Sequence, residues 1–445
     1  MNDSRISDLF EFLRFPSVST QSEHMVDMIA CAEWLKHKFI SLGFQSDVYQ
    51  TGGHPAVIAK TRHDSARPTI LIYGHYDVQP PEPLEEWTSP PFEPTIRDGR
   101  IYARGSTDNK GQIMAHILGA GDLLSQGGKL PANLIFLVEG EEETGSDNLG
   151  GFLEQHRAEL DCDVIVISDT GMAAPGYPTL TFSLRGIAAL QFNVHGPTQD
   201  LHSGVFGGAV MNPATVAARL IASLHDEEGR VAIDGFYNDV RPLLDWEREA
   251  AAELPITESD ICALAGVKEL AGEPGFTAIE RVGARPTAEV NGMGGGYQGE
   301  GTKTVLPREA FAKLTFRLVP NQHPEEILRL AEAHLLARCP KGVRLEILPG
   351  HCGEPYYVDP NSVYGKASLR ALERVFGRRP ALMREGGSIP IVTTFKKVLN
   401  ADSLLLALAA PDCRAHSPNE NFPLENFFAG MRLNQAIVEE IGRLN

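Results

Sequence analysis

Apolar and polar positions follow two spacings in the first part of the chain. Met25, Ile29 and Phe39 recur at helical spacing, which predicts a helix over residues 24–42. Short runs of Ile, Val and Tyr between turn residues predict buried strands. We predict further helices over residues 5–14, 111–124 and 149–160, and strands over residues 56–59, 69–73, 133–138 and 164–167. This alternation predicts an α/β fold with a mixed, mostly parallel sheet between helices.

The pattern changes after Arg185. Polar and apolar residues alternate from 188 to 194, which predicts the first strand of a second unit. Further strands are predicted over residues 310–319 and 343–348, and helices over residues 213–224 and 324–337. The β-α-β-β-α-β order suggests a ferredoxin-like α+β domain. Its expanded middle, residues 226–280, carries few clear signals of helices or strands.

The α/β pattern resumes after Pro355, with a helix over 362–376, a strand over 403–408 and a helix over 426–443. The second unit is therefore inserted into the first. A chain of 445 residues is also too long for one ordinary core. We predict one domain made of residues 1–185 and 353–445, and an inserted domain of residues 186–352.

The composition limits which partners the protein is expected to bind and in which cellular compartment it is expected to lie. The net charge of −18 argues against nucleic acid and anionic membrane as partners. The longest apolar run, 404–410, is too short to cross a bilayer, and no apolar run follows the N-terminus as in a signal peptide. The six cysteines are scattered without close pairs, which suits a reducing compartment. We expect a cytoplasmic protein.

Carboxylates and imidazoles follow the predicted strands. His75 and Asp77 come directly after one strand, and their spacing lets one residue bind a metal while the other supports the imidazole. The H-x-D pattern also occurs by chance in many proteins. Asp108 precedes a predicted helix, where it is either an N-cap or a carboxylate that bridges two cations.

The run Glu141-Glu142-Glu143 is the strongest local signal. A very apolar strand ends there in carboxylates that repel one another, and nearby cations would relieve this repulsion. A solvated acidic turn is the alternative. Asp169 would complete the shell of one cation and His416 that of another. Carboxylates and imidazoles gathered at strand ends can hold two divalent cations, which predicts a dinuclear metallohydrolase. Such an enzyme also needs a base that is not itself a ligand, and adjacent glutamates can divide these two roles.

The motifs resemble those of one family of dinuclear metallopeptidases. This family includes carnosinases, cytosolic non-specific dipeptidases, carboxypeptidase G, aminoacylases and succinyl-diaminopimelate desuccinylase. The similar segments span nearly the whole chain: YGHYDVQP (73–80), ARGSTDNKGQ (103–112), EGEEETGS (139–146), Ser168-Asp169, LHSGVFGG (201–208), REGGSIP (384–390) and AHSPNE (415–420). The segments KTVLP (303–307), FRLVP (316–320) and Gly350-His351 are most similar to the carnosinase-like dipeptidases.

The resemblance implies a role for each residue of the site. Asp77 would orient His75, and Glu142 would activate the bridging water. A cis peptide would follow Asp108. The implied ligands of the first metal are His75, Asp108 and Asp169, and those of the second are Asp108, Glu143 and His416.

The inserted domain would be a lid and dimerisation domain. His202 would reach across the dimer to the scissile carbonyl, in an oxyanion-hole role. Glu385, with Asp169, would face the free ammonium of the substrate. The implied carboxylate-binding residues are Arg317, His351, Ser388 and the partner subunit's Thr304. Without the resemblance, Arg317 would be read as a solvated strand arginine and Glu385 as a surface partner of Arg384.

These inferences predict a homodimeric dipeptidase that acts on small peptides with free amino and carboxyl ends. The nearest alternative is an N-acyl-amino-acid deacylase or carboxypeptidase of the same family. A non-catalytic amino-acid-binding relative and a two-histidine, one-carboxylate iron oxygenase fit the residues less well. Two divalent cations are expected, zinc first from the mixed histidine and carboxylate set, with manganese left open.

Overall fold

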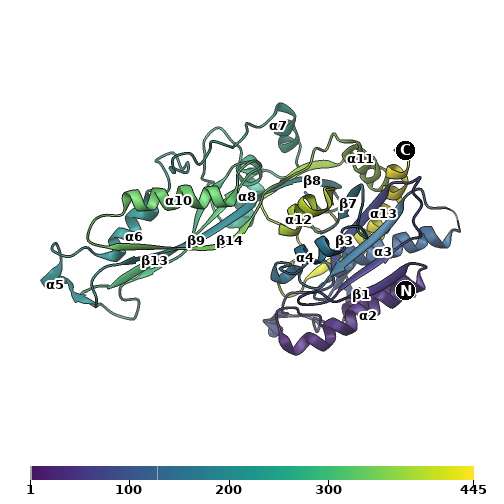
Figure 1. Ribbon diagram of the computed structural model, residues 1–445, viewed down its shortest axis with the longest axis horizontal. Coiled ribbons are helices and arrows are strands. Elements are labelled where there is room, and N and C mark those ends of the chain that lie inside the picture. The colour runs from purple at the N-terminus through teal and green to yellow at the C-terminus, as the bar shows by residue number, and fades with distance from the viewer. Residues whose placement is uncertain (1–2, 128, 445) are drawn as a thin grey trace.

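A computed structural model describes residues 3–127 and 129–444. The molecule is elongated, with both termini in the part that holds the larger sheet (Figure 1). Buried apolar side chains form two separate clusters. One lies around the larger sheet, and the other lies in the inserted unit around Phe192, Leu314 and Phe316. No described helix is both long and apolar enough to cross a membrane.

The larger sheet has nine strands in the order β1-β2-β6-β3-β7-β17-β8-β15, with β16 pairing to β8. The strands are β1 Gln45–Tyr49, β2 Ala56–Lys60, β3 Thr69–His75, β6 Asn133–Glu139, β7 Val164–Ile167, β8 Thr179–Leu184, β15 Tyr356–Tyr357, β16 Ala381–Glu385 and β17 Asp402–Leu406. The central strands β6, β3, β7 and β17 run parallel, whereas β1, β2 and β15 pair antiparallel to their neighbours. The sheet is therefore mixed, as predicted.

Helices cover this sheet on both sides, which explains why every residue of β3, β6 and β7 is buried. The helices of this part are α1 Ser4–Leu13, α2 Met25–Ser41, α3 Lys110–Ser125, α4 Leu149–Gln155, α11 Val363–Phe376, α12 Pro390–Leu399 and α13 Leu424–Gly442. Figure 1 shows α3 and α13 on one side of β3 and β7, and α4 and α12 on the other. A small sheet of β4 Thr95–Arg97, β5 Arg100–Tyr102 and β18 Asn421–Pro423 lies apart from the larger one.

The inserted unit has a four-stranded sheet in the order β11-β13-β9-β14. Its elements are β9 Gly186–His195, α6 Pro213–Ala222, β11 Thr287–Gly295, β13 Glu309–Leu318, α10 Pro324–Arg338 and β14 Arg344–Gly353. Their β-α-β-β-α-β order confirms the prediction of a ferredoxin-like unit. Exposed and buried residues alternate along β13, because the helices cover only one face of this sheet.

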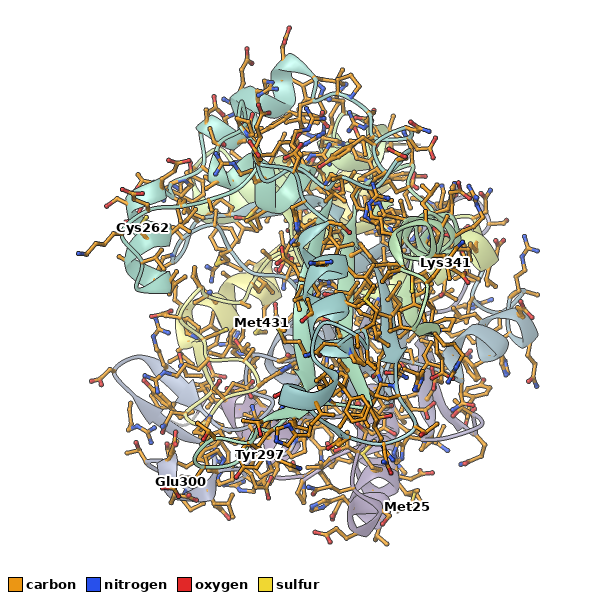
Figure 2. All side chains as sticks on the ribbon, turned by 90° about the vertical axis from the view of Figure 1, so that its left-hand side faces the viewer. Met25, Cys262, Tyr297, Glu300, Lys341 and Met431 are labelled. Carbon is orange, nitrogen blue, oxygen red and sulfur yellow. The ribbon has the colours of Figure 1, made fainter. Side chains whose placement is uncertain are left out.

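Short elements extend the inserted unit. They are β10 Leu201–His202, α5 Ser203–Phe206, α7 Asp245–Ala252, α8 Glu258–Ala265, α9 Ala278–Ala284 and β12 Val305–Leu306. Helices α7 and α8 lie in the region 226–280 that carried few sequence signals, and α9 begins at its end. Figure 2 looks at the inserted unit from its far end, with Tyr297 of the loop after β11 low in the view and Cys262 of α8 high on one side.

Some elements differ from the sequence predictions. Helix α4 ends at Gln155 and not at residue 160, and Glu159 in the turn that follows contacts Tyr49, Lys60 and His156. Strand β11 was not predicted, since its three glycines at 292, 294 and 295 weaken the strand signal. Strand β16 was not predicted either, because the charged pair Arg384-Glu385 ends a run of only three apolar residues.

Candidate metal centre

Five side chains from distant parts of the sequence form one ligand cluster: His75, Asp108, Glu143, Asp169 and His416. His75 ends β3, Glu143 lies in the single turn η3 (Glu142–Thr144) after β6, and Asp169 follows β7. These strands are parallel neighbours, so their carboxyl ends meet at one edge of the sheet. Asp108 lies just before α3, and His416 lies in the loop after β17.

Asp108 connects two groups within the ligand cluster. Its Oδ1 lies 3.1 Å from Nε2 of His75, and its Oδ2 lies 2.9 Å from Nε2 of His416. Asp169 is 3.9 Å from His75, and Glu143 is 3.3 Å from His416. In each group of three, the potential ligand atoms lie within 4.8 Å of one another. One carboxylate oxygen facing each group is the arrangement of a carboxylate that bridges two cations.

The ligand cluster carries more negative than positive charge. Hydrogen bonds to Asp108 and Glu143 raise the pKa of His416 to about 10. Burial raises the pKa of Asp169, and the neighbouring charge of Asp108 raises it further. The histidines and carboxylates thus favour positive charge between them, and they fit two divalent cations in both charge and donor type.

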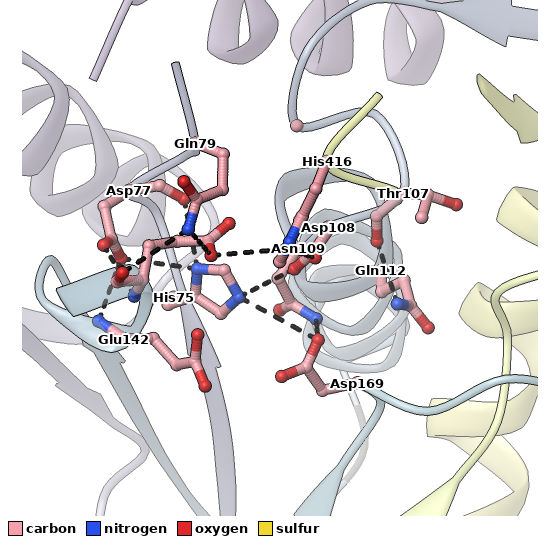
Figure 3. A network of polar contacts seen from close by, with 12 residues as sticks. His75, Asp77, Gln79, Thr107, Asp108, Asn109, Gln112, Glu142, Asp169 and His416 are labelled. Atoms are coloured by element: carbon pink, nitrogen blue, oxygen red, sulfur yellow. Dashed lines mark hydrogen bonds and ion pairs between the residues drawn. The ribbon is translucent and has the colours of Figure 1, made fainter. Parts of the chain in front are cut away.

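Asp77 supports the ligand cluster from behind. Its buried carboxylate lies 3.3 Å from Nδ1 of His75, on the side of the ring away from Asp108. The same carboxylate accepts the backbone N–H groups of Glu142 and Glu143, at 3.3 and 3.1 Å. Figure 3 shows these contacts joining the end of β3 to the turn after β6. Asp77 therefore contacts one potential ligand, His75, and the backbone of another, Glu143.

Glu142 lies beside the ligand cluster without belonging to either group of three. Figure 3 shows its carboxylate below the ring of His75 and next to Asp169. Among the described residues, no hydrogen bond to this carboxylate is formed. Burial raises its pKa well above the ordinary value, and the charges of Asp169 and Asp108 add to this effect. A carboxylate with a raised pKa in such a position can accept and return a proton.

Three buried or partly buried groups that sequence reasoning did not single out form hydrogen bonds with potential ligands. Asn109 donates to Asp169 Oδ1 at 2.9 Å, and Gln79 donates to Glu143 Oε2 at 2.8 Å. Glu420 accepts the backbone N–H of Asp108 at 3.0 Å and is fully buried. Glu420 ends the AHSPNE segment, so its place in that motif was the available signal. The peptide between Asp108 and Asn109 is cis, as the resemblance implies.

The expected substrate-binding residues divide into two sets. In the first set, Arg317 donates to Ser388 Oγ at 3.0 Å, and Ser388 donates to the carbonyl oxygen of Arg185. Within the part of the chain that the structure describes, the buried carboxylate oxygen Oε2 of Glu385 has no hydrogen-bond partner. Burial and the nearby charge of Asp169 raise the pKa of Glu385 to about 7. Glu385 therefore lies near the ligand cluster, while Arg317 and Ser388 are joined to each other and to the backbone of Arg185.

In the second set, His202 and Thr304 lie away from the ligand cluster of the same chain. His202 and Thr304 are exposed, and they neighbour each other because β10 pairs with β12 and Ser203 N–H donates to Thr304 O. Figure 1 shows α5, which His202 precedes, at the far end of the inserted unit. His351 is exposed on β14.

Comparison with known proteins relates this geometry to enzymes. Residues 71–440 match the sequence profile of one protein family, which is described as "Peptidase family M20/M25/M40". The chain is 31% identical to a Cys-Gly metallodipeptidase of Schizosaccharomyces pombe, over 100% of this chain and 96% of that protein.

Two solved structures share the fold over almost the full length. The metallo-carboxypeptidase Sso-CP2 of Sulfolobus solfataricus has a TM-score of 0.86 at 34% identity, covering 99% of this chain and 100% of that one. Human carnosine dipeptidase 1 has a TM-score of 0.81 at 27% identity, covering 99% and 96%.

Proposed function

This chain belongs to peptidase family M20/M25/M40, and we propose that it is a metal-dependent dipeptidase acting on dipeptides with free amino and carboxyl ends. One observation carries the proposal. Two groups of potential ligands share Asp108, and the unbonded carboxylate of Glu142 lies beside them. A protein that only binds amino acids would not need such a spare base.

We propose that His75, Asp108 and Asp169 hold one cation and that Asp108, Glu143 and His416 hold the other. When bound, two such ions polarise a carbonyl and lower the pKa of a water molecule between them. Zinc suits the histidine and carboxylate donors, and manganese accepts the same donors. Asp77 and Asn109 would keep His75 and Asp169 in their present orientations, since both already contact them.

In this proposal Glu142 moves the proton. Its carboxylate would take a proton from the attacking water and then give it to the nitrogen of the leaving amine. Burial raises the pKa of Glu142, which helps this carboxylate to hold the proton before it passes to the leaving nitrogen. The positive charge of bound cations would lower that pKa, so that the group is free to accept a proton at neutral pH.

The two ends of the dipeptide would bind to opposite charges. Arg317 and Ser388 would hold the carboxylate, for which a guanidinium offers a planar pair of donors. Glu385 and Asp169 would face the ammonium, which supplies the partner that Glu385 Oε2 lacks.

We further propose a homodimer. His202 and Thr304 lie too far from their own ligand cluster to act there. The partner subunit's His202 and the partner subunit's Thr304 would therefore complete the site. His351 of the same chain would approach the site when the inserted domain closes over it. The six free cysteines suit a cytoplasmic location.

A carboxypeptidase or deacylase is the second candidate, and the likeness to Sso-CP2 favours it. The two functions differ in what they require near Glu385. A substrate with a blocked amino group has no ammonium to offset a buried carboxylate, so Glu385 would be unfavourable there.

The deciding experiment measures hydrolysis of a free dipeptide and of its N-acetyl form by protein loaded separately with zinc and with manganese. We expect cleavage of the free dipeptide and at least about tenfold lower kcat/KM for the acetylated one. Faster cleavage of the acetylated peptide would instead establish the deacylase or carboxypeptidase. If neither the zinc-loaded nor the manganese-loaded protein cleaved either peptide, this result would contradict the proposal.

A further inference from the structure

A cavity of about 430 Å³ opens beside the residues proposed to hold the substrate's carboxylate. One wall comes from β11 and β13, which contribute Glu289 and Arg317. The opposite wall comes from the region between α6 and β11, including Glu273 and Arg285. Arg185 lines the same cavity. Residues 226–280, which carried few signals of secondary structure in the sequence, thus contribute to the lining of the cavity next to Arg317.

The lining of this cavity is positively charged. It contains four arginines, at 185, 281, 285 and 317, and two glutamates, at 273 and 289, which gives 4 − 2 = +2. The arginines differ in the partners that their guanidinium groups already contact. Arg285 forms a two-bond ion pair with Glu273, at 2.7 and 2.8 Å, and Arg281 donates to two backbone carbonyls.

Arg185 and Arg317 lie near each other in this lining. Among the described residues, no carboxylate lies within ion-pair distance of Arg185, Arg281 or Arg317, whereas Arg285 is paired with Glu273. Arg185 Nε donates to the carbonyl oxygen of Gly386, and Ser388 joins the backbone of Arg185 to the guanidinium of Arg317. The pKa of Arg185 is lowered to about 10 by burial and by the charge of Arg317. The pair therefore places two positive charges at one end of the cavity.

We propose that this cavity receives the side chain of the substrate's C-terminal residue, and that Arg185 selects dipeptides in which that side chain carries a second carboxylate. This inference rests on the proposed function, in which Arg317 and Ser388 hold the main-chain carboxylate. A dipeptide ending in Glu or Asp brings two negative charges, which match the positive charges of Arg185 and Arg317. The exposed Glu289 opposes this attraction, but solvent screens its charge more than that of buried groups.

The test compares Ala-Glu with Ala-Gln, which have nearly the same shape and differ by one charge. For metal-loaded wild-type protein we expect kcat/KM to favour Ala-Glu by about tenfold. In Arg185→Gln the ratio should fall to about one, and in Arg185→Lys it should be intermediate. Arg329→Gln is the matched control, because it removes an arginine that pairs with Glu326 on exposed α10 and should keep the wild-type ratio.

The ratio separates specificity from folding. A variant that folds poorly loses activity on both peptides equally and leaves their ratio unchanged. A wild-type ratio near one, or a preference that survives in Arg185→Gln, would overturn this inference alone. Cleavage of neither peptide would overturn the proposed function and the inference together.

Discussion

Glu420 and Arg104 form a buried ion pair, 2.7 Å between Oε2 and Nη1, that joins the two segments of the larger unit. The same carboxylate accepts the backbone N–H groups of Gly105, Thr107 and Asp108, at 2.9, 2.8 and 3.0 Å. Glu420 also belongs to the segment that carries His416. One carboxylate thus positions the loops of both ligands that lie outside the ends of the strands.

Replacing Glu420 should damage both folding and metal binding. In Glu420→Gln, Arg104 stays buried without a counter-charge, so we expect the free energy of unfolding to fall by about 3 kcal/mol. Displacement of the Asp108 loop should weaken metal binding by about tenfold or more. Urea unfolding and metal titration measure the two effects.

Asp412→Asn provides the matched control for Glu420→Gln. Asp412 pairs with Arg100 at 2.9 Å, but the aspartate side chain is 62% exposed. A surface pair of this kind contributes less than about 1 kcal/mol. Equal destabilisation by the two substitutions would show that Glu420 is not the buried link described here.

Glu142→Ala should separate metal binding from turnover. Glu142 is outside both groups of ligands, so we expect the variant to bind both metals while kcat falls by about 100-fold or more. Metal content and steady-state kinetics are the measurements. Glu141→Gln is a useful comparison, since the Glu141 carboxylate contacts Asn148 and Thr51 instead and should matter far less for kcat. An active Glu142→Ala enzyme would rule out the assignment of the base.

Glu385→Gln should affect only substrates with a free amino group. Loss of the charge facing the ammonium should raise KM for a free dipeptide by about tenfold. Weak hydrolysis of the N-acetyl dipeptide should remain unchanged or increase, because its blocked nitrogen has no charge to lose. An equal effect on both substrates would indicate that Glu385 supports the fold of β16 and does not contact the ammonium.

The strand ends of the site were predictable from sequence, because apolar runs define β3, β6 and β7 and the polar residues that follow must meet at one edge. The meeting of His416 with Asp108 was not predictable in this way. It depends on loop backbone, with His416 itself at φ 61°, and on the contact of Glu420 with a loop more than 300 positions earlier.

The placement of β16 was equally hidden from pattern analysis. Glu247 of α7 pairs with Arg384 of β16, and both are largely buried. Helix α9 also packs closely, since a side chain at Gly283 would collide with Arg384. These contacts are specific to the folded chain and have no periodicity, so local sequence could not reveal that the inserted region supports the strand carrying Glu385.

His116 should make the folded protein sensitive to acid. It is buried between Ser168 and Asn434, at 2.8 and 3.3 Å, and burial lowers its pKa from 6.5 to about 4. At a pH between the two pKa values, His116 is protonated in the unfolded chain but not in the folded one. The free energy of unfolding therefore decreases as the pH falls through this range. We expect His116 to account for a loss of about 2 kcal/mol between about pH 7 and pH 5, measured as the difference in urea unfolding between wild type and His116→Gln. Parallel losses in the two proteins would show that His116 is not responsible.

Mixing two inactive variants should reveal whether His202 acts across the dimer. His202→Ala lacks the residue that would reach the partner's site, and Glu142→Ala lacks the base of its own site. In a mixed dimer, the site of the His202→Ala chain keeps its Glu142 and receives the partner subunit's His202, so it alone is complete. Random pairing of equal amounts, by co-expression, should therefore restore about a quarter of wild-type activity, since half of the dimers are mixed and each has one complete site. If His202 acted within its own chain, neither site of a mixed dimer would be complete, and no activity would return.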